Sequence, residues 1–429
     1  MNSSNTNPAR SRQLPEERFA PALEQQAQPF FDAISAVKLE SESGYVERSL
    51  YSVSHEAQLL EDYLDRHGAN HNKRFHLIRE DVSGIRWVAK ALSCLSLLKE
   101  GPNSYPAADI TWNNERLASH VEISAHCLAE YLENLTAQFN SSWLAAGLPL
   151  VDPKVTEVLV HPPVPVLPSD LINEEDAKED DNPRAALYLS RYLRLFNSWK
   201  SEATQRISSD SDWPSFMQKY CTEAIARSFE SRVHNLQSDY DSHIRNSKQE
   251  LACPQLRKIR GAVSQCLHLL ESVTAITHLY ERHRHQRQLS AVLPWKALVT
   301  LLVNHLIYPA YKSLKVAAPL AQELLAEISI VGCVQVKLPD GVDMHARPLS
   351  LIANIVKHHG LDVEIECAQD RANAASFMAM LVVIGSNPDE RTYSFYGDNA
   401  VISDIKQLFE LGLGENGLDK VTDAFPYLK

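Results

Sequence analysis

Apolar residues recur every three or four positions along most of the first three quarters of the chain. Two stretches, 117–139 and 263–276, show this spacing most plainly. Side chains at this spacing share one face of a helix, so the pattern predicts long amphipathic helices, each with one buried stripe. Three further helices are expected at 185–201, 216–244 and 294–328. The pattern therefore predicts a mainly α-helical region up to about residue 330.

The pattern changes after residue 330. Short alternations of apolar and polar residues, as at 363–367, are typical of half-buried strands, and 348–359 has the spacing of an amphipathic helix that ends at Gly360. The predicted elements are strand 333–338, helix 348–359, strand 363–367, strand 371–374, helix 377–384, strand 393–396 and helix 400–411. This β-α-β-β-α-β-α order predicts an α+β domain in which helices cover one face of an antiparallel sheet.

Glycine and proline indicate where the regions divide. Only six of the 14 glycines precede residue 331, and the return of glycine predicts a compact fold with many turns. A proline-dense stretch followed by an acidic run predicts a linker or a long surface loop. The predicted divisions are a disordered tail at 1–26, a helical block at 27–147, the linker at 148–184, a second helical block at 185–330, the α+β domain at 331–415 and a C-terminal tail at 416–429.

The charge balance is acidic. The chain has 54 acidic and 42 basic residues, a formal net charge of −12, and 44% hydrophobic residues. This balance fits a globular protein and argues against broad binding to nucleic acid or to anionic membranes. The most apolar run, 297–307, contains Asn304 and His305 and is too short to span a bilayer. We therefore expect a cytoplasmic protein with no membrane span and no nucleic-acid partner.

The spacing of cysteine and histidine predicts no metal site, and no motif predicts a cofactor. The seven cysteines are scattered without a Cys-x-x-Cys pair, which favours reduced thiols. His278, His283 and His285 do not share a helical face, and we interpret them as a basic helix end. Residues 1–330 contain no phosphate loop, dinucleotide fingerprint or nucleophile elbow, so the role of the helical region is not predicted.

Candidate chemistry lies in the segment Pro-Asp-Gly-Val-Asp-Met-His-Ala-Arg-Pro at 339–348. His345 comes directly before a predicted helix, whose free N–H groups and dipole would stabilise an anion. Arg347 adds a permanent positive charge and a forked set of donors for phosphate oxygens. Since an imidazole nitrogen is a competent nucleophile at neutral pH, these features predict a phosphohistidine site at His345.

The His-Ala-Arg-Pro motif, after a Pro-Asp-Gly turn and before an apolar helix, resembles the active site of the HPr family of phosphocarriers in the bacterial phosphotransferase system. The resemblance covers about 331–415 and includes the order of elements and Ser376, which opens the second helix. It implies an open-faced sandwich in which His345 accepts a phosphoryl group from an Enzyme I-like donor and passes it to a downstream acceptor or regulated protein. Arg347 would hold the phosphate oxygens, and Ser376 corresponds to a serine that a serine kinase modifies in some members.

Two features depart from the family's pattern. Val342, Asp343 and Met344 separate the turn glycine from His345, where the family usually has one residue. The Asp343 carboxylate is expected to restrain phosphorylation, because it would repel a phosphoryl dianion. Ala375 stands where a lysine commonly precedes the regulatory serine. Serine at a helix start is also explained by capping alone.

The sequence thus favours a phosphocarrier or regulator in which an HPr-like domain, phosphorylated at His345, relays or senses phosphate through a fused helical module. This interpretation makes the protein more a regulator than an enzyme in its own right. The alternative is an interaction or scaffold module with the same fold that carries no phosphate and is regulated at Ser376. A third reading places an enzyme site in the helical region.

Overall fold

A computed structural model gives the fold of the chain. Its contacts divide the chain into two compact units, which we describe separately. The first unit comprises Met1–Pro168, Glu202–Ser231 and Ser264–Ser313, and the second Ser169–Ser201, Arg232–Val263 and Leu314–Lys429. The residues whose structure is described are 14–40, 47–98, 111–112, 115–154, 184–199, 206–207, 213–328, 331–339, 341–415 and 417–428.

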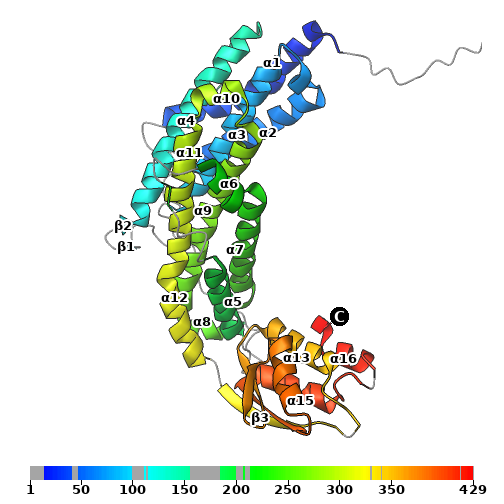
Figure 1. Ribbon diagram of the computed structural model, residues 1–429. Helices are drawn as coiled ribbons and strands as arrows, with labels where there is room; N and C mark the ends of the chain where they lie inside the picture. Colours follow the sequence, from blue (N-terminus) through cyan, green and yellow to red (C-terminus); the bar gives the residue numbers. More distant parts are fainter. Residues whose placement is uncertain are drawn as a thin grey trace, which may run out of the picture. The chain divides into compact units, whose positions relative to one another are not determined.

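The first unit is built of helices and carries a short hairpin of β1 (Thr111–Trp112) and β2 (Glu115–Arg116). Its helices are α1 (Glu16–Glu40), α2 (Glu47–Arg66), η1 (Ala69–His71), α3 (His76–Ser96), α4 (Leu117–Ala145), α6 (Trp213–Tyr220), α10 (Arg287–Val292), α11 (Trp295–Leu301) and the π-helix η4 (Leu302–Ile307) (Figure 1). Three further helices, α7 (Glu223–His243), α9 (Leu256–His283) and α12 (Tyr308–Ile328), contribute residues to both units.

Aromatic rings join α1 to α4 in the core of the first unit. Phe30 of α1 packs edge-on against Phe139 of α4, with ring centroids 5.1 Å apart. Phe31 meets Trp143 of α4 in the same way at 5.2 Å. All four side chains are buried, and burying rings of this size supplies much of the stability of a helical core. The stripe expected over 117–139 is therefore the buried face of α4.

The helical region begins earlier than the sequence pattern indicates. α1 starts at Glu16, within the stretch 1–26 for which the sequence predicts a disordered tail, and Phe19 and Leu23 are buried. Pro21 and Pro29 lie inside α1 and conceal it, because proline normally interrupts a helix. Residues 1–13 of the predicted tail and 155–183 of the predicted linker lie outside the described residues.

Two of the long predicted helices are divided. The stretch 216–244 forms α6 and α7, which are separated at Cys221 and Thr222. The stretch 294–328 forms α11, η4 and α12 in direct succession. A π-helical turn accommodates an extra residue, which shifts the apolar stripe without ending the helix.

The helical part of the second unit contains α5 (Arg184–Trp199) and α8 (Lys248–Ala252) together with the ends of the longer helices. A buried carboxylate, Glu250 of α8, joins this helix to the end of α7: it accepts hydrogen bonds from the Tyr240 hydroxyl at 2.6 Å and from the Asn246 backbone N–H at 2.8 Å. Ser247 caps α8 through its hydroxyl. Satisfying a buried carboxylate in this way offsets its desolvation.

The C-terminal part of the second unit is an α+β domain around a four-stranded antiparallel sheet. Its elements are β3 (Val331–Lys337), α13 (Ala346–His359), β4 (Val363–Cys367), β5 (Asp370–Asn373), α14 (Phe377–Ser386), β6 (Thr392–Asp398) and α15 (Asn399–Glu410) (Figure 1). The strands are hydrogen-bonded in the order β3-β6-β4-β5. Burial alternates along β4 and β6, as it does when helices cover one face of a sheet. The predicted helical region followed by a small α+β domain is confirmed.

The stretch 416–429, predicted as a tail, adds to the core of this domain. It contains α16 (Asp419–Ala424) and η5 (Pro426–Leu428), and the side chains of Val421 and Phe425 belong to the same buried cluster as the sheet and helices. The Tyr427 hydroxyl donates a 2.7 Å hydrogen bond to Asp404 of α15. The domain therefore extends beyond the predicted boundary at residue 415.

Candidate functional site

His345 is the N-cap residue of α13. Its Nδ1 accepts a hydrogen bond from the backbone N–H of Arg347, with the two nitrogens 3.4 Å apart. The side chain thus takes the place that a serine or aspartate usually fills, and it presents the Nδ1 lone pair to the positive end of the helix. The His345 side chain is 49% exposed and that of Arg347 52%, so an outside group can approach both.

The loop before His345 is held from the neighbouring strand. Gly341 has a φ of 79°, which suits glycine, and the Val342 side chain is buried in the domain core. Arg391, which directly precedes β6, donates to the Pro339 carbonyl at 2.8 Å and the Val342 carbonyl at 3.2 Å. The loop is therefore anchored by the buried Val342 side chain and braced by Arg391, and it ends with His345 at the start of α13.

A carboxylate that the sequence analysis does not single out lies against His345. Glu415 Oε1 is 3.0 Å from His345 Nε2 and 3.4 Å from Arg347 Nη1. His345, Arg347 and Glu415 thus form one cluster, in which Nδ1 faces the helix end and Nε2 faces the carboxylate. The two ring nitrogens have distinct partners, which is the condition for a defined tautomer.

Left-handed backbone brings Glu415 to this position. Gly412, Leu413 and Gly414 follow α15 with φ values of 76°, 55° and 77°. Leu413 is fully buried, and its left-handed conformation costs a non-glycine residue about 1 kcal/mol or more. A Cβ on Gly414 would lie 3.0 Å from Leu351 Cδ1 of α13, so the turn packs tightly on that helix. The Leu-Gly-Leu-Gly-Glu run at 411–415 is the sequence signal for this turn.

Asp343, expected to restrain phosphorylation, is turned toward a cation. Its side chain is 88% exposed, and Oδ1 lies 3.7 Å from Arg391 Nη1. A surface ion pair at this distance is weak, but its positive partner partly offsets the aspartate charge. Of the two acidic side chains described around His345, Glu415 is the one that makes contact with the ring.

Ser376 caps α14, as the sequence pattern predicts. Its hydroxyl accepts a hydrogen bond from the Ala379 N–H at 3.3 Å. Capping accounts for serine at this position, and modification by a kinase stays a prediction. Beyond it, α14 exposes three large apolar side chains, Met378, Leu381 and Val382, at 64%, 40% and 64%. We call these three residues the α14 patch.

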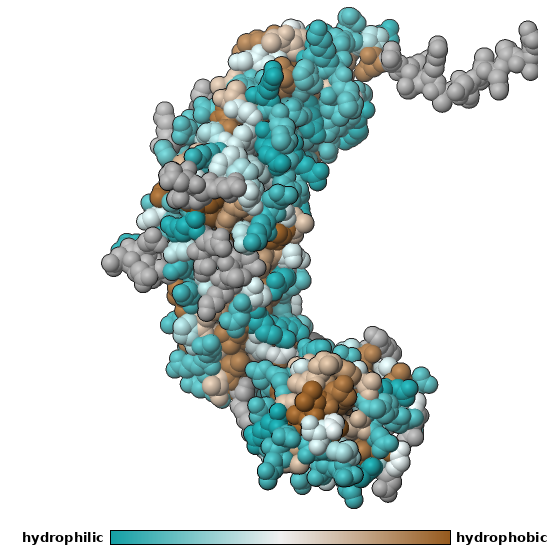
Figure 2. Space-filling model, in the orientation of Figure 1, coloured by the Kyte–Doolittle hydropathy of each residue, from teal (hydrophilic) through white to brown (hydrophobic). Residues whose placement is uncertain are grey.

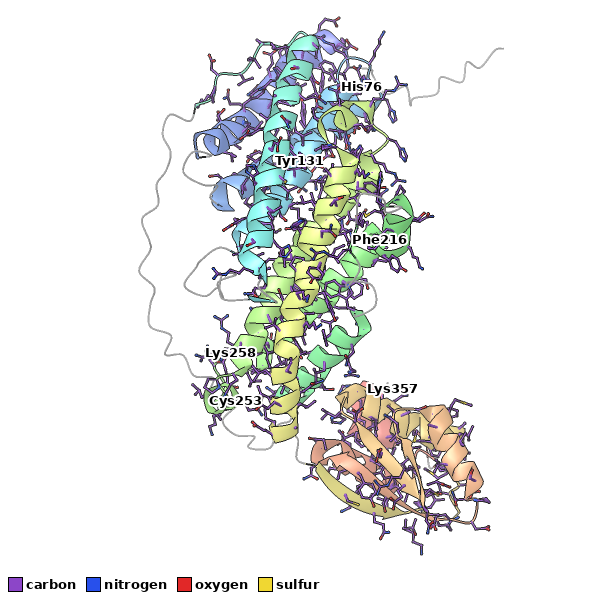
Figure 3. The ribbon with its side chains drawn as sticks, turned by 60° about the vertical axis from the view of Figure 1, so that its left-hand side comes forward. His76, Tyr131, Phe216, Cys253, Lys258 and Lys357 are labelled. Carbon is purple, nitrogen blue, oxygen red and sulfur yellow. The ribbon has the colours of Figure 1, made fainter. Side chains whose placement is uncertain are left out.

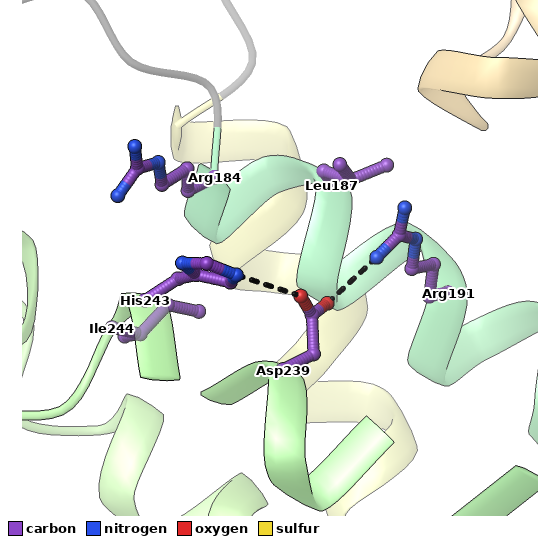
Figure 4. A pocket seen from close by; sticks show the side chains of 6 residues that line it. All are labelled: Arg184, Leu187, Arg191, Asp239, His243 and Ile244. Atoms are coloured by element: carbon purple, nitrogen blue, oxygen red, sulfur yellow. Dashed lines mark hydrogen bonds and ion pairs between the residues drawn. The ribbon is translucent and has the colours of Figure 1, made fainter. Parts of the chain in front are cut away.

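Polar clusters also occur in the helical regions. In the first unit, His283 is buried, its Nδ1 2.9 Å from Glu80 and its Nε2 3.1 Å from the Ser83 hydroxyl. His283 is the last residue of α9 and lies in its basic last turn, as the sequence predicts, and its side chain is buried. In the second unit, Asp239 lies 2.8 Å from Arg191 and 4.0 Å from His243, in a pocket between α5 and α7 (Figure 4).

A shallow, mostly apolar hollow of about 630 Å³ lies in the first unit. Tyr131 of α4 and Leu301 of α11 are among the side chains that line it, with His305 of the π-helix (Figure 3 labels Tyr131). His305 and His120 face each other through their Nδ1 atoms, which are 3.2 Å apart. The His305 ring on the wall of this hollow is thus paired with His120.

Within the described residues, no group of three or more histidine, cysteine, aspartate or glutamate side chains could hold a metal ion. No helix in the described part of the chain is long and apolar enough to cross a membrane. Comparison of the chain with family models, with curated proteins and with solved structures found no match in any of the three. The cluster of His345, Arg347 and Glu415 is therefore the candidate site on its geometry alone.

Proposed function

We propose that the C-terminal domain is an HPr-type phosphocarrier that accepts a phosphoryl group on His345 and acts as a regulator through the fused helical region. The observation that carries this proposal is the half-exposed His345 ring, whose Nδ1 lone pair lies at the start of α13 beside Arg347. The β-α-β-β-α-β-α order and the strand order β3-β6-β4-β5 are consistent with the open-faced sandwich that the sequence resemblance implies.

The proposed transfer balances without an added reactant. The Nδ1 lone pair attacks the phosphorus of an Enzyme I-like phosphohistidine, an N–P bond forms on His345, and the N–P bond of the donor breaks. Once Nδ1 carries the phosphoryl group, it no longer accepts from the Arg347 N–H. That N–H, the first N–H groups of α13 and the Arg347 guanidinium can then stabilise the phosphoryl oxygens. A downstream acceptor would reverse these steps at His345. We expect the protein to work in the cytoplasm, where such a donor operates.

The α14 patch is the surface that we propose contacts the donor and the downstream partner. Apolar surface gathers on the face of the C-terminal domain that Figure 2 shows, and the side chains of Met378, Leu381 and Val382 are exposed. Isolated apolar residues are common on surfaces, but residues three and four positions apart in a helix share one face, so Met378, Leu381 and Val382 lie together. Leu349, near the start of α13, is fully buried and belongs to the core of the domain.

The proposed regulatory step is electrostatic. Phosphorylation would add about −1.5 to −2 charge beside Arg347 and Glu415, enough to change which partner the domain binds. The helical units would then serve as the output module or scaffold, since the clusters described in them are internally paired.

The test is phosphorylation of the full chain by Enzyme I, phosphoenolpyruvate and magnesium. We expect an acid-labile label on the wild-type chain and none on His345→Ala. His359→Ala is the matched control, because His359 lies in the same domain and pairs with Asp404 at 2.7 Å. Equal labelling of wild type and His345→Ala would refute the proposal. An acid-stable label on Ser376 from a serine kinase, with none on His345, would favour the scaffold alternative.

A further inference from the structure

The geometry points to Glu415 as a positioning residue that holds the imidazole proton of His345 on Nε2 and keeps Nδ1 unprotonated, so that its lone pair can exchange the Arg347 N–H for the phosphoryl group. This inference rests on the proposed function, and it adds a group from outside the His-Ala-Arg-Pro motif. Glu415 is 70 positions along the chain from His345, and it comes from the turn after α15.

The two contacts of the ring define its tautomer. Nδ1 accepts the backbone N–H of Arg347 at 3.4 Å, so this nitrogen carries a lone pair. Nε2 faces the Glu415 carboxylate at 3.0 Å, and a carboxylate can only accept, so the ring proton resides on Nε2. A carboxylate that fixes the far nitrogen of a reactive histidine sets both the tautomer and the ring orientation.

The turn that carries Glu415 is built at a conformational cost. Leu413 adopts a φ of 55° although it has a side chain, and that side chain is fully buried. Strain of this kind persists where the surrounding packing determines it, and it concentrates at functional sites. Gly414 cannot gain a Cβ without meeting Leu351 at 3.0 Å and Leu418 at 3.2 Å. The carboxylate is thus held by a rigid turn, as a positioning group requires.

The charge of Glu415 also suits the transfer. When neutral imidazole attacks through Nδ1 and keeps its Nε2 proton, the ring becomes positively charged. Glu415 lies at the nitrogen opposite the new N–P bond, so it stabilises that charge through the Nε2–H. Arg347 directs only Nη1 toward Glu415, at 3.4 Å, and its remaining donors can reach phosphate oxygens.

The experiment measures the tautomer and the transfer separately on the full chain. The ring ¹⁵N resonances of His345 are assigned with His345→Ala and recorded at about pH 8, where imidazole is normally neutral. We expect wild type to show the Nε2–H tautomer. Glu415→Ala and Gly414→Ala should both shift the resonances toward a mixture. Glu415→Gln should keep the tautomer, because its amide oxygen can still accept from Nε2–H. Glu410→Ala, which removes an exposed carboxylate from the end of α15, should change nothing.

The initial rate of phosphorylation is then measured on the same variants. Glu415→Ala should lower it about tenfold or more, and Glu415→Gln should recover part of the loss. An unchanged tautomer in Glu415→Ala, or faster phosphorylation of this variant, would overturn the inference; the latter would mean that Glu415 blocks the site. If wild type is not labelled at all, the proposed function fails, whereas the ¹⁵N spectra still decide whether Glu415 positions the ring.

Discussion

Several histidines of this chain contact a glutamate, and two of these pairs, His283 with Glu80 and His345 with Glu415, lie in different surroundings. His283 Nδ1 is 2.9 Å from Glu80, and His345 Nε2 is 3.0 Å from Glu415. The His283 side chain is 7% exposed, whereas that of His345 is 49% exposed. The other nitrogen of His283, Nε2, is hydrogen-bonded to the Ser83 hydroxyl. The other nitrogen of His345, Nδ1, faces the N-terminus of α13. A histidine–glutamate contact alone therefore does not mark a reactive site.

Solvent accessibility distinguishes the structural pair from the reactive one. Ser83, His283 and Glu80 have the connectivity of a nucleophile, a base and an orienting carboxylate. Ser83 is completely buried in the middle of α3, so no substrate can reach its hydroxyl. Buried polar groups that satisfy one another are normally structural. We therefore assign this network to the stability of the first unit, and the exposed pair to chemistry.

The largest expected effect comes from breaking the buried pair. His283→Ala would leave Glu80 and Ser83 in the interior without this partner, and we expect the free energy of unfolding to fall by about 3 kcal/mol. The counterpart in the more accessible pair, Glu415→Ala, should change the free energy of unfolding by less than about 0.5 kcal/mol. Denaturant titration of the full chain compares the two. Similar losses in both variants would contradict the distinction between a structural and a chemical pair.

A second prediction uses Asp81, the buried neighbour of Glu80. Burial raises the pKa of Asp81 to about 6 from its ordinary value of 3.8, although side-chain hydrogen bonds from Ser142, Gln138 and Gln288 act in the opposite direction. Because the folded state favours the protonated acid, its contribution to stability is present below about pH 4 and is lost as the pH rises to about 6. One pKa unit corresponds to about 1.4 kcal/mol, so the loss should be about 3 kcal/mol.

The measurement is the difference in unfolding free energy between wild type and Asp81→Asn as a function of pH. This difference removes the titration of the other carboxylates from the comparison. It should change between about pH 4 and 6 and be constant above that range. Ser376→Ala, which removes no titratable group, is the control and should leave the pH profile unchanged. A flat difference for Asp81→Asn would show that its carboxylate is not desolvated.

A third prediction concerns Ser376, the exposed counterpart of the buried Ser83. Since its hydroxyl caps α14, Ser376→Ala should lower the free energy of unfolding by about 1 kcal/mol. Ser376→Asp should restore it, because aspartate is an equally good cap. Denaturant titration of the three chains measures both changes. If Ser376→Asp is no more stable than Ser376→Ala, the cap does not explain the serine.

Local pattern predicts the elements of this protein well and their long-range contacts poorly. The strand at 363–367 has the predicted bounds, and the helix predicted at 348–359 begins two residues earlier, at Ala346. The bounds of these two elements are set by residues close together in the sequence. α1 is missed because Pro21 and Pro29 lie within it. Sequence pattern therefore locates apolar stripes, turns and strand alternation, and it fails where packing overrides propensity.

In the candidate site, too, the sequence predicts the residues of one local motif and misses the residue that comes from a distant element. His345 and Arg347 are adjacent in one motif, so the sequence can place both at a helix start. Glu415 reaches His345 from a distant turn, and the Leu-Gly-Leu-Gly run predicts left-handed backbone there without indicating where the turn points. His283 meets Ser83 across 200 residues, and no local pattern carries that information. Contacts of this kind follow from the packing of whole elements.

The smallest expected effect tests whether charge near His345 matters when it makes no contact. Asp343→Asn should raise the phosphorylated fraction at equilibrium, because it removes a negative charge near the phosphoryl group. The Asp343 side chain is 88% exposed and lies 3.7 Å from Arg391, so both water and a cation weaken its repulsion. We expect less than about a twofold increase at low salt, vanishing at about 0.15 M salt, where charges separated by about 8 Å or more are screened.

Glu364→Gln, an equal charge change on β4, is the control. A large increase that persists at high salt would mean that Asp343 contacts the phosphoryl group directly, which would make it, rather than Glu415, the acidic group that governs the site.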